Sequence, residues 1–342
     1  MFEREKEKLM ADGMHLRNYS DKKRNNKELV MIAVRQNGCA LEFASDDLKN
    51  DKDVVIEAVR QFGYALRYAS PRLRNDRDVV FEAINQYAYA LEYASDALKG
   101  DKDVALKTVN QHGDALWYAS REIRGDRDVV FAAVNNVGGA LRFANTELQN
   151  DKDVVIAAVR QWGPALQYAS DNLRNDRDVV LAAVEQNGNA LEYAGFELMN
   201  NKNVVLKAVS ENGLALRYAS REMRNDKDVV LAAVRQTGYA LQHTTDELKN
   251  DKDVVIEAVS QRGCALRYAS PKMRNNKDVV LKAVEQDGEA LEFASPKIRD
   301  NKDVILKAIE QNGFALVALE DAILKDAALK DVILNAVEKL YS

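Results

Sequence analysis

Apolar and polar residues alternate along this chain in a pattern that repeats without insertion or deletion. The segment from Asp51 to Asn75 reads DKDVVIEAVRQFGYALRYASPRLRN, and a closely similar segment, Asp76–Gly100, follows it directly. The same 25-residue frame runs from Asn26 to Lys325, which gives twelve repeats. A fixed period in this range is typical of proteins built by stacking one helical or strand unit. We therefore expect one elongated body rather than several globular domains.

Small and polar residues mark the helix ends within each repeat, whose position 1 we take as the place of Asp51. Position 1 is Asp or Asn, and position 20 is Ser, Thr, Asn or Gly until Glu320; both sets favour helix N-termini. Position 13 is Gly in eleven repeats, with Ala88 as the exception, and we expect this Gly to end the first helix. Three of the four prolines directly follow position 20, as Pro71 does, which suits the first turn of a helix. The pattern predicts a helix over positions 2–12, a second over 14–19 and a short helical turn over 21–24.

The apolar positions predict how these helices pack. Positions 4, 5, 6, 8 and 9 are apolar and should all be buried, so that the first helix is nearly enclosed by its neighbours. Position 18 is Tyr or Phe in ten repeats, and we interpret this row of rings as packing at a seam with one dry and one wet edge. Positions 5, 9, 16, 19 and 23 have near-heptad spacing, as in a coiled coil. The regular Gly, Ser-Pro and Asn-Asp interruptions argue against one long helix.

The two ends of the chain depart from the repeat. Residues 1–25 keep its frame only in their second half, and the segment 331–340 resembles the first helix three residues out of frame. Atypical, more polar ends are what a stacked array needs at its termini. We predict an all-α, right-handed α-solenoid superhelix, with the handedness taken from other helical repeats. Its parts are an N-terminal cap that is a degenerate half repeat (1–25), twelve helix–turn–helix repeats (26–325) and a C-terminal capping helix (326–342).

Composition and cysteine usage limit where such a protein can work. Hydrophobic residues make up 46% and charged residues 30% of the chain, typical of a soluble folded protein. No apolar run approaches the length of a membrane span, and the charged start MFEREKEKLM is not a secretory signal. Cys39 and Cys264 both occupy position 14, nine repeats apart, so we expect no disulfide between them and a reducing, cytoplasmic setting.

We find no pattern that predicts catalysis. The three histidines, His15, His112 and His243, lack ligand spacing to Cys, Asp or another His, and there is no phosphate-binding Gly loop or nucleophile elbow. A regular solenoid presents rows of residues rather than converging pockets. We therefore expect no enzyme activity, no cofactor and no metal site.

Several repeat positions carry polar side chains for which we expect a structural role instead of a functional one. Positions 1 and 3 are mostly acidic and position 2 is always Lys or Arg, which predicts helix capping and ion pairs between repeats rather than phosphate or cation binding. Position 11 is Gln in ten repeats and should tie the carbonyl groups freed at the Gly turn to the adjacent repeat. The segment 241–246, LQHTTD, replaces the usual aromatic-Ala-Ser by His243, Thr244 and Thr245, and we expect Thr244 to bond within its own helix.

Positions that differ between repeats are the better candidates for recognition. Positions 12, 14 and 17 vary most, and in three successive repeats they gather aromatic groups. Exposed aromatics at this density mark partner surfaces, although packing between repeats is the alternative. The candidate partner-binding residues are Phe62, Tyr64, Tyr87, Tyr89, His112, Trp117 and Trp162.

Three phrases resemble a known family: NDKDVVLAAV (225–234), QNGNALEYA (186–194) and LRNDRDVVLAAV (173–184). They are similar to the DUF4116-type helical repeats, a domain of unknown function, and the similarity covers nearly the whole chain. The resemblance implies an α-helical repeat body and no catalytic or binding residues. Ala88, Ala105 and the segment 243–245 depart from the pattern locally.

The function that we expect is a non-enzymatic scaffold that binds a protein or peptide along the variable positions. A self-assembling filament or shell protein is an alternative, because stacked repeats can continue end to end. A reader of single-stranded nucleic acid that uses one residue pair per repeat is a second alternative. The net charge of −5 and the acidic rows argue against nucleic acid, and nothing in the sequence predicts membrane binding.

Overall fold

The computed structural model describes residues 2–311. The predicted C-terminal cap at 326–342 and the end of the twelfth repeat lie outside these residues. The chain divides into two compact units, Met1–Ser170 (unit 1) and Asp171–Ser342 (unit 2). Each described repeat contains a ten-residue α-helix, a six-residue 3₁₀ helix and a short third helix. The prediction of an all-α solenoid is confirmed; its handedness stays a prediction.

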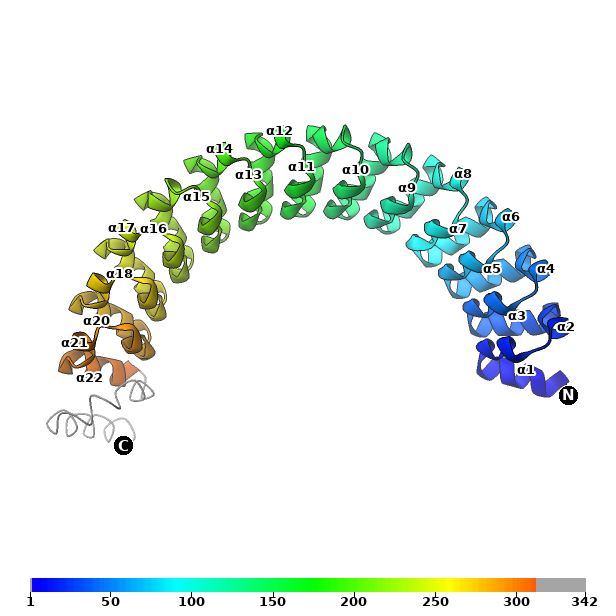
Figure 1. Ribbon diagram of the computed structural model, residues 1–342, viewed down its shortest axis with the longest axis horizontal. Helices are drawn as coiled ribbons and strands as arrows, with labels where there is room; N and C mark the ends of the chain where they lie inside the picture. Colours follow the sequence, from blue (N-terminus) through cyan, green and yellow to red (C-terminus); the bar gives the residue numbers. More distant parts are fainter. Residues whose placement is uncertain (1, 312–342) are drawn as a thin grey trace. The chain divides into compact units, whose positions relative to one another are not determined.

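Unit 1 contains seven sets of helices (Figure 1). Its ten-residue helices are α1 (Phe2–Ala11), α3 (Lys27–Gln36), α5 (Lys52–Gln61), α7 (Arg77–Gln86), α9 (Lys102–Gln111), α10 (Arg127–Asn136) and α11 (Lys152–Gln161). Its six-residue 3₁₀ helices are η1 (Gly13–Asn18), η2 (Gly38–Phe43), η3 (Gly63–Tyr68), η4 (Ala88–Tyr93), η5 (Gly113–Tyr118), η7 (Gly138–Phe143) and η9 (Gly163–Tyr168). Its short third helices are α2 (Asp21–Arg24), α4 (Asp46–Lys49), α6 (Pro71–Arg74), α8 (Asp96–Lys99), η6 (Ile123–Gly125) and η8 (Leu148–Asn150).

Unit 2 repeats the arrangement through residue 311. Its ten-residue helices are α13 (Arg177–Gln186), α15 (Lys202–Glu211), α16 (Lys227–Gln236), α18 (Lys252–Gln261), α20 (Lys277–Gln286) and α22 (Lys302–Gln311). Its six-residue 3₁₀ helices are η10 (Gly188–Tyr193), η11 (Gly213–Tyr218), η13 (Gly238–His243), η14 (Gly263–Tyr268) and η15 (Gly288–Phe293). Its short third helices are α12 (Asp171–Arg174), α14 (Phe196–Met199), η12 (Met223–Asn225), α17 (Asp246–Lys249), α19 (Pro271–Arg274) and α21 (Pro296–Arg299).

The helix boundaries agree with the predicted ones to within one residue, except that the short helices η6, η8 and η12 begin two residues later than predicted. The second helix differs in kind. It is a 3₁₀ helix that begins at position 13, closed by bonds such as that from the Ala65 N–H to the Phe62 carbonyl at 2.8 Å. Position 1 caps the long helix as predicted: the Asp51 carboxylate accepts from the backbone amides of Asp53 and Val54. The position-20 side chain caps the third helix in the same way, since the Ser70 Oγ accepts from the Leu73 N–H.

The N-terminal segment is more complete than a half repeat. Residues 2–24 form all three helices, α1, η1 and α2. Leu9 and Leu16 are fully buried, and Lys6 pairs with Glu28 of the next repeat at 2.6 Å. Helix α1 is mostly charged, but its Leu9 is buried as the apolar residues of the following long helices are.

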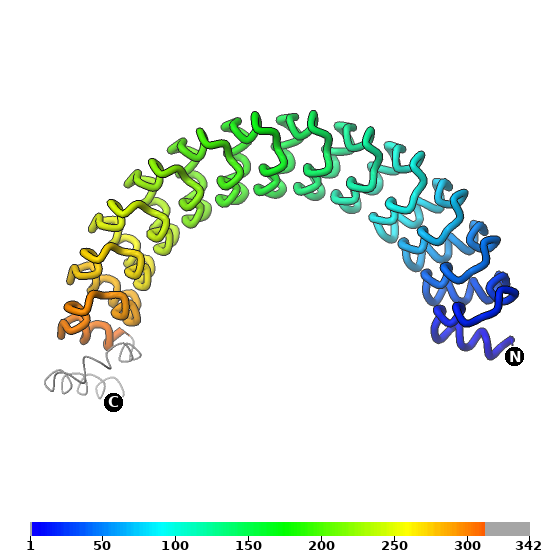
Figure 2. The backbone as a smooth tube through the Cα atoms, in the orientation of Figure 1, coloured from blue at the N-terminus to red at the C-terminus, as the bar shows by residue number. Residues whose placement is uncertain are grey.

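The long helices of each unit stack side by side in one layer, with the short third helices on the opposite side of the repeat (Figures 1 and 2). Positions 4, 5, 8 and 9 are enclosed by the preceding and following helices: Val54, Val55, Ala58 and Val59 are all 0% exposed. The prediction that position 6 is also buried is wrong, because Ile56 and its equivalents are partly exposed. The core is therefore a continuous row of valine and alanine shared by neighbouring repeats, with position 6 at its solvent edge.

Glycine at position 13 has a different cause from the predicted one. No residue among 2–311 has a positive φ, so these glycines do not supply a left-handed helix end. The chain instead passes very close to the next repeat: a Cβ atom on Gly63 would lie 2.4 Å from the Ala83 carbonyl oxygen. Glycine is required because only a bare α carbon fits against that carbonyl.

The position-11 amide joins successive repeats at this same contact. The Gln36 Oε1 accepts from the Gly13 N–H at 2.7 Å, and the Gln36 Nε2 donates to the Ala11 carbonyl at 3.5 Å. Further Gly N–H to amide bonds link Gly63 to Gln86, Gly113 to Asn136, Gly138 to Gln161, Gly213 to Gln236, Gly238 to Gln261, Gly263 to Gln286 and Gly288 to Gln311. The structural interpretation of this row is confirmed, and its main partner is a backbone N–H. We call this pair of bonds the amide clamp.

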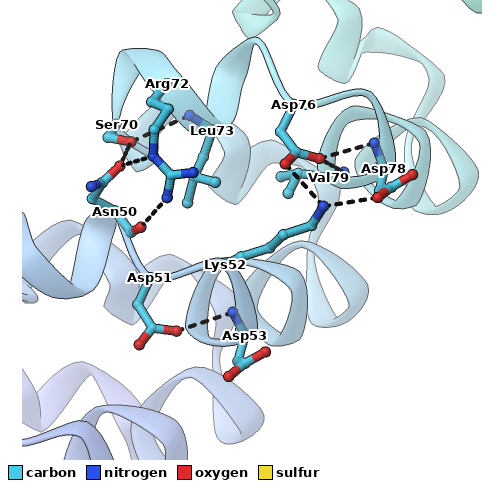
Figure 3. Close-up of polar contacts among 10 residues, drawn as sticks. All are labelled: Asn50, Asp51, Lys52, Asp53, Ser70, Arg72, Leu73, Asp76, Asp78 and Val79. Atoms are coloured by element: carbon cyan, nitrogen blue, oxygen red, sulfur yellow. Dashed lines mark hydrogen bonds and ion pairs between the residues drawn. The ribbon is translucent and has the colours of Figure 1, made fainter.

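Position 2 forms a second link between repeats (Figure 3). The Lys52 ammonium lies 2.9 Å from Asp76 and 2.8 Å from Asp78, which are positions 1 and 3 of the next repeat. Arg77 bridges Asp101 and Asp103 in the same way. This confirms the predicted ion-pair ladder, and it places each position-2 cation of this kind between two carboxylates.

A third link joins the short helices. The Ser70 hydroxyl donates to the Asn50 Oδ1 at 2.7 Å, while the Ser70 N–H donates to the Lys49 carbonyl at 2.9 Å. Arg72 adds bonds to the side chain and carbonyl of Asn50 (Figure 3). The same Ser–Asn bond recurs in repeats of both units, for example between Ser270 and Asn250.

One junction in unit 1 departs from this packing. Ala88 replaces the position-13 Gly, and the residue it faces in the next repeat is Thr108 instead of Ala. Helices α7 and α9 approach each other less closely than α5 and α7 or α9 and α10 do. Gln111 correspondingly bonds only the Asn85 carbonyl, at 3.0 Å. Larger groups on both sides of the tightest contact therefore separate these two repeats.

Candidate functional site

Five of the seven predicted site residues form one continuous surface on η3, η4 and the ends of α5, α7 and α9. The Phe62 ring stacks on Tyr87 with centroids 6.5 Å apart and lies 5.7 Å from Tyr64. The Tyr87 and Tyr89 rings are 5.3 Å apart, and Tyr89 lies 4.9 Å from the His112 ring. The Tyr89 hydroxyl is 2.9 Å from the His112 Nδ1. We call Phe62, Tyr64, Tyr87, Tyr89 and His112 the aromatic strip.

The strip extends inward through the tyrosines of position 18. Tyr64 meets Tyr93 edge-on at 5.0 Å, and Tyr89 meets Tyr118 edge-on at 6.0 Å. Edge-to-face pairs of this kind add about 0.5–1.5 kcal/mol to the burial of each ring. The strip is therefore held firmly at its base, and its outer rings remain accessible: Phe62 is 40% and Tyr87 39% exposed.

Arg67 is a site residue that the sequence did not reveal. Its guanidinium lies 4.9 Å from the Tyr64 ring centre, 5.2 Å from Tyr68 and 5.8 Å from Tyr93, and it donates to the Tyr64 hydroxyl. Position 17 is Arg or Glu in many repeats, so nothing in the sequence distinguishes this arginine. Its three rings come from two repeats, and only the fold brings them together.

Burial changes the acidity of the strip. Burial, with a smaller effect of the Asp114 charge, raises the pKa of Tyr89. Burial and a hydrogen bond to Glu92 raise the pKa of Tyr93 to about 12. These phenols are therefore neutral at physiological pH, so the strip presents hydroxyl groups and ring faces together with the cationic Arg67.

Trp117 and Trp162 lie apart from the strip. The Trp117 ring rests on Phe143 at 5.3 Å and is 56% exposed. Trp162 packs over the preceding repeat, with ring atoms 3.5 Å from the position that a Cβ of Gly139 would occupy. This is an ordinary contact distance, and Trp162 is 38% exposed, so the indole packs on the preceding repeat and also remains accessible.

The same variable positions in unit 2 are less aromatic. Tyr239, Arg262 and Asp287 help line a cavity of about 410 Å³, with the Arg262 guanidinium 4.8 Å from the Tyr239 ring centre. Burial and a bond to Asp287 raise the pKa of the Cys264 thiol to about 12. Such a thiol is a poor nucleophile, because the thiolate is the reactive form. Cys39 and Cys264 are both free.

The structure also bears on Thr244, on metal-binding clusters and on membrane-spanning helices. The Thr244 hydroxyl is buried and donates to the Leu241 carbonyl at 3.0 Å, which confirms its local bonding. Over residues 2–311, no cluster of three His, Cys, Asp or Glu side chains is arranged to hold a metal ion. Within the same range, no helix has the length and apolar character to cross a membrane.

The chain is similar to a known family of repeats. The model of the family described as Domain of unknown function (DUF4116) matches the chain eight times, at residues 26–74, 51–99, 76–124, 126–166, 151–199, 201–249, 236–274 and 276–322. The chain belongs to this family. The longest matches each span about two successive 25-residue repeats. No curated protein matches the chain.

Proposed function

We propose that this member of the DUF4116 family is a non-enzymatic scaffold that binds a protein or peptide on the aromatic strip of unit 1. The observation that carries the proposal is the unbroken contact of Phe62, Tyr64, Tyr87, Tyr89 and His112 across three successive repeats. Tyrosine supplies a large contact area with two side-chain torsions, so it loses little conformational freedom on binding.

The chemistry of the strip favours an extended peptide with apolar side chains. The accessible ring faces offer apolar contacts, and the neutral hydroxyl groups can bond the carbonyl and N–H groups of a peptide backbone. The position-2 cations such as Lys52 and Arg77 are engaged by pairs of carboxylates, which disfavours a nucleic-acid backbone as the ligand. The free thiols fit a cytoplasmic location.

Selection from a random peptide library on the whole chain, followed by calorimetry, tests the proposal. A variant with Phe62, Tyr64, Tyr87 and Tyr89 changed to Ser should bind the selected peptides at least about tenfold more weakly, because aromatic anchors dominate binding energy. The matched control changes Asn187, Asn189, Asn212 and Leu214 to Ser, at the same positions in unit 2, and should leave the affinity unchanged. If the unit 1 variant retains folding by circular dichroism and full affinity, the proposal is wrong.

A further inference from the structure

A pocket of about 320 Å³ lies in unit 1 beside the short helices η6 and η8. Arg121 and Arg124 supply two cations to its wall, and Asn145, Thr146 and Gln149 supply polar groups. The remainder of the lining is Phe143 and Ala144, without any carboxylate. The composition of this wall favours an anion.

Several residues in and beside this pocket differ from the commonest residue at their repeat position, although position 21 also differs at Phe196 and Arg221. Position 21, which is Asp or Pro in most repeats, is Arg121 and then Thr146. Position 17 is Trp117, where the other repeats, apart from the last with Val317, carry a charged or amide side chain. These substitutions remove two carboxylates or prolines and add a cation, a hydroxyl and an indole. Such a cluster of unusual residues is expected where a repeat protein has a recognition site.

Gly125 and Asn145 stand where most repeats have Asn at position 25 and Ser at position 20, and this changes the hydrogen bonds beside the pocket. Elsewhere a position-20 Ser hydroxyl donates to a position-25 Asn, as Ser70 does to Asn50. Here position 25 is Gly125, and the Asn145 Nδ2 lies 2.7 Å from the place that a Cβ atom on Gly125 would occupy. The Asn145 Oδ1 caps Leu148 at 2.9 Å, and its Nδ2 has no hydrogen-bond partner within residues 2–311. The exchange therefore replaces an internally satisfied pair with a free N–H donor.

The two arginines also have unused donors. Neither Arg121 nor Arg124 has an ion-pair partner in the part of the chain that the structure describes. The Arg124 Nε is buried without a hydrogen bond, as it also is in the equivalent Arg24, Arg74, Arg224 and Arg274. The neighbouring Glu122 bonds its own backbone amide and Ser120, and its pKa is lowered by this bonding and, to a smaller extent, by the charges of Arg121 and Arg124. The Arg124 guanidinium lies 5.8 Å from the Trp117 ring centre, and Trp117 in turn rests on Phe143. Cationic donors and an exposed aromatic face therefore lie next to each other.

Unit 2 provides an internal comparison. A pocket of about 310 Å³ lies at the corresponding positions, and Arg221 occupies the place of Arg121. Its wall contains Glu222 and Glu247. Unit 1 has Glu122 and Glu147 at the same positions, but neither lines its pocket, so of these two pockets only the one in unit 1 has a wall without a carboxylate.

We propose that the pocket at Arg121 and Arg124 binds a carboxylate or phosphate group whose aromatic or apolar carrier packs against Trp117. Arginine forms paired hydrogen bonds with both anions, and the Asn145 amide adds a donor. The assignment of this anion to a peptide side chain rests on the proposed scaffold function; anion binding itself does not. The site would select acidic or phosphorylated partner peptides.

Trp117 fluorescence tests the site in the whole chain. With Trp162→Phe, Trp117 is the single tryptophan. Titration with phenyl phosphate and with phenylacetate should change its emission saturably, with a Kd of about 1 mM for ligands of this size, while neutral benzyl alcohol should not. Arg121→Glu should weaken binding roughly tenfold or more, and Arg221→Glu should leave it unchanged.

The outcomes separate the two sources of the anion and the two proposals. Tighter phenyl phosphate binding supports a phosphorylated side chain, and tighter phenylacetate binding supports an acidic one. No saturable change with either anion, an equal change with benzyl alcohol, or unchanged binding in Arg121→Glu would overturn the inference. The four-serine variant of the aromatic strip should still bind the probes, so failure of the scaffold proposal leaves this result readable.

Discussion

The α carbon of Gly63 and the carbonyl oxygen of Ala83 are in such close contact that a Cβ at Gly63 would lie 2.4 Å from that oxygen. Gly63→Ala should therefore destabilise the array by about 1–3 kcal/mol, the range for overpacking a tight interior. Urea unfolding followed by circular dichroism measures this loss. Gly100→Ala is the matched control, because its Cβ would meet nothing closer than 3.5 Å and its φ of −94° suits alanine. A similar loss in both variants would contradict the close-contact explanation.

Glu211 identifies a junction where the amide clamp can be restored. It occupies position 11, but its carboxylate bonds Lys207 at 3.1 Å and has no N–H to donate to a carbonyl of the preceding repeat. Glu211→Gln should supply the missing Nε2–H donor. It also removes the charge that holds the side chain to Lys207, so its Oε1 can accept from the Gly188 N–H, and the junction should gain about 0.5–1.5 kcal/mol. Slower hydrogen exchange at the Gly188 amide is the expected signal. Glu211→Ala, which supplies no acceptor, should not slow it.

The Lys52–Asp76 pair predicts a loss of stability in acid. Burial by itself favours a higher pKa for Asp76, but the hydrogen bond from Lys52 and the amides of Val79 and Asp78 outweigh it and lower the pKa. A lowered pKa in the folded state gives stability that is present above about pH 3.9 and is lost as the pH falls through the folded value. Asp76→Asn keeps the helix cap and should cost about 0.3–1 kcal/mol at pH 7 and nothing near pH 2.

Salt provides the second measurement on this pair. The difference between the wild type and Asp76→Asn at pH 7 should shrink in about 1 M salt, where exposed charges are screened within a few Å. Asn276 occupies the same position naturally, so an uncharged cap is compatible with the fold. A difference that is independent of both pH and salt would mean that the variant disturbs capping instead of the ion pair.

His243 should make unit 2 sensitive to mild acid. Burial and the nearby charges of Arg217, Arg224 and Lys249 lower its pKa. Because the unfolded chain then binds a proton that the folded chain does not, stability should fall as the pH drops below about 6.5, the value for an unperturbed histidine. His243→Tyr restores the usual ring of position 18 and should remove this dependence. Thermal unfolding of both proteins at pH 5 and pH 8 measures the effect.

The sequence predicts the helix boundaries well because they depend on local chemistry. Asp51 and Ser70 cap helices with their own side chains, and these caps are legible in one repeat. The roles of Gly63 and Gln86 were harder to predict, because both depend on the distance between repeats. Helix-ending glycine is the more common local pattern, and the exclusion of a Cβ by the next repeat becomes visible only when the repeats are stacked.

The candidate site was predictable in part for the same reason. The recurrence of Phe62, Tyr64, Tyr87 and Tyr89 at two positions of adjacent repeats placed them on one surface, as the structure has them. Trp162 is at one of these two positions and Trp117 is at the third variable position, 17, but they lie in other local packings, Trp162 over Gly139 and Trp117 on Phe143. The spacing of aromatic residues along the chain does not predict which neighbouring side chain packs on each ring.

The pairing of Ala88 with Thr108 has a mechanical consequence. Each repeat of a solenoid is supported by its two neighbours, so the weakest interface determines where the structure first separates. Under a pulling force, or in low denaturant, we expect unit 1 to part between Tyr93 and Lys102, leaving the repeats on either side folded. Because Tyr89 and His112 lie on opposite sides of that interface, a ligand bound across both rings would act as a brace and raise the force needed to part them.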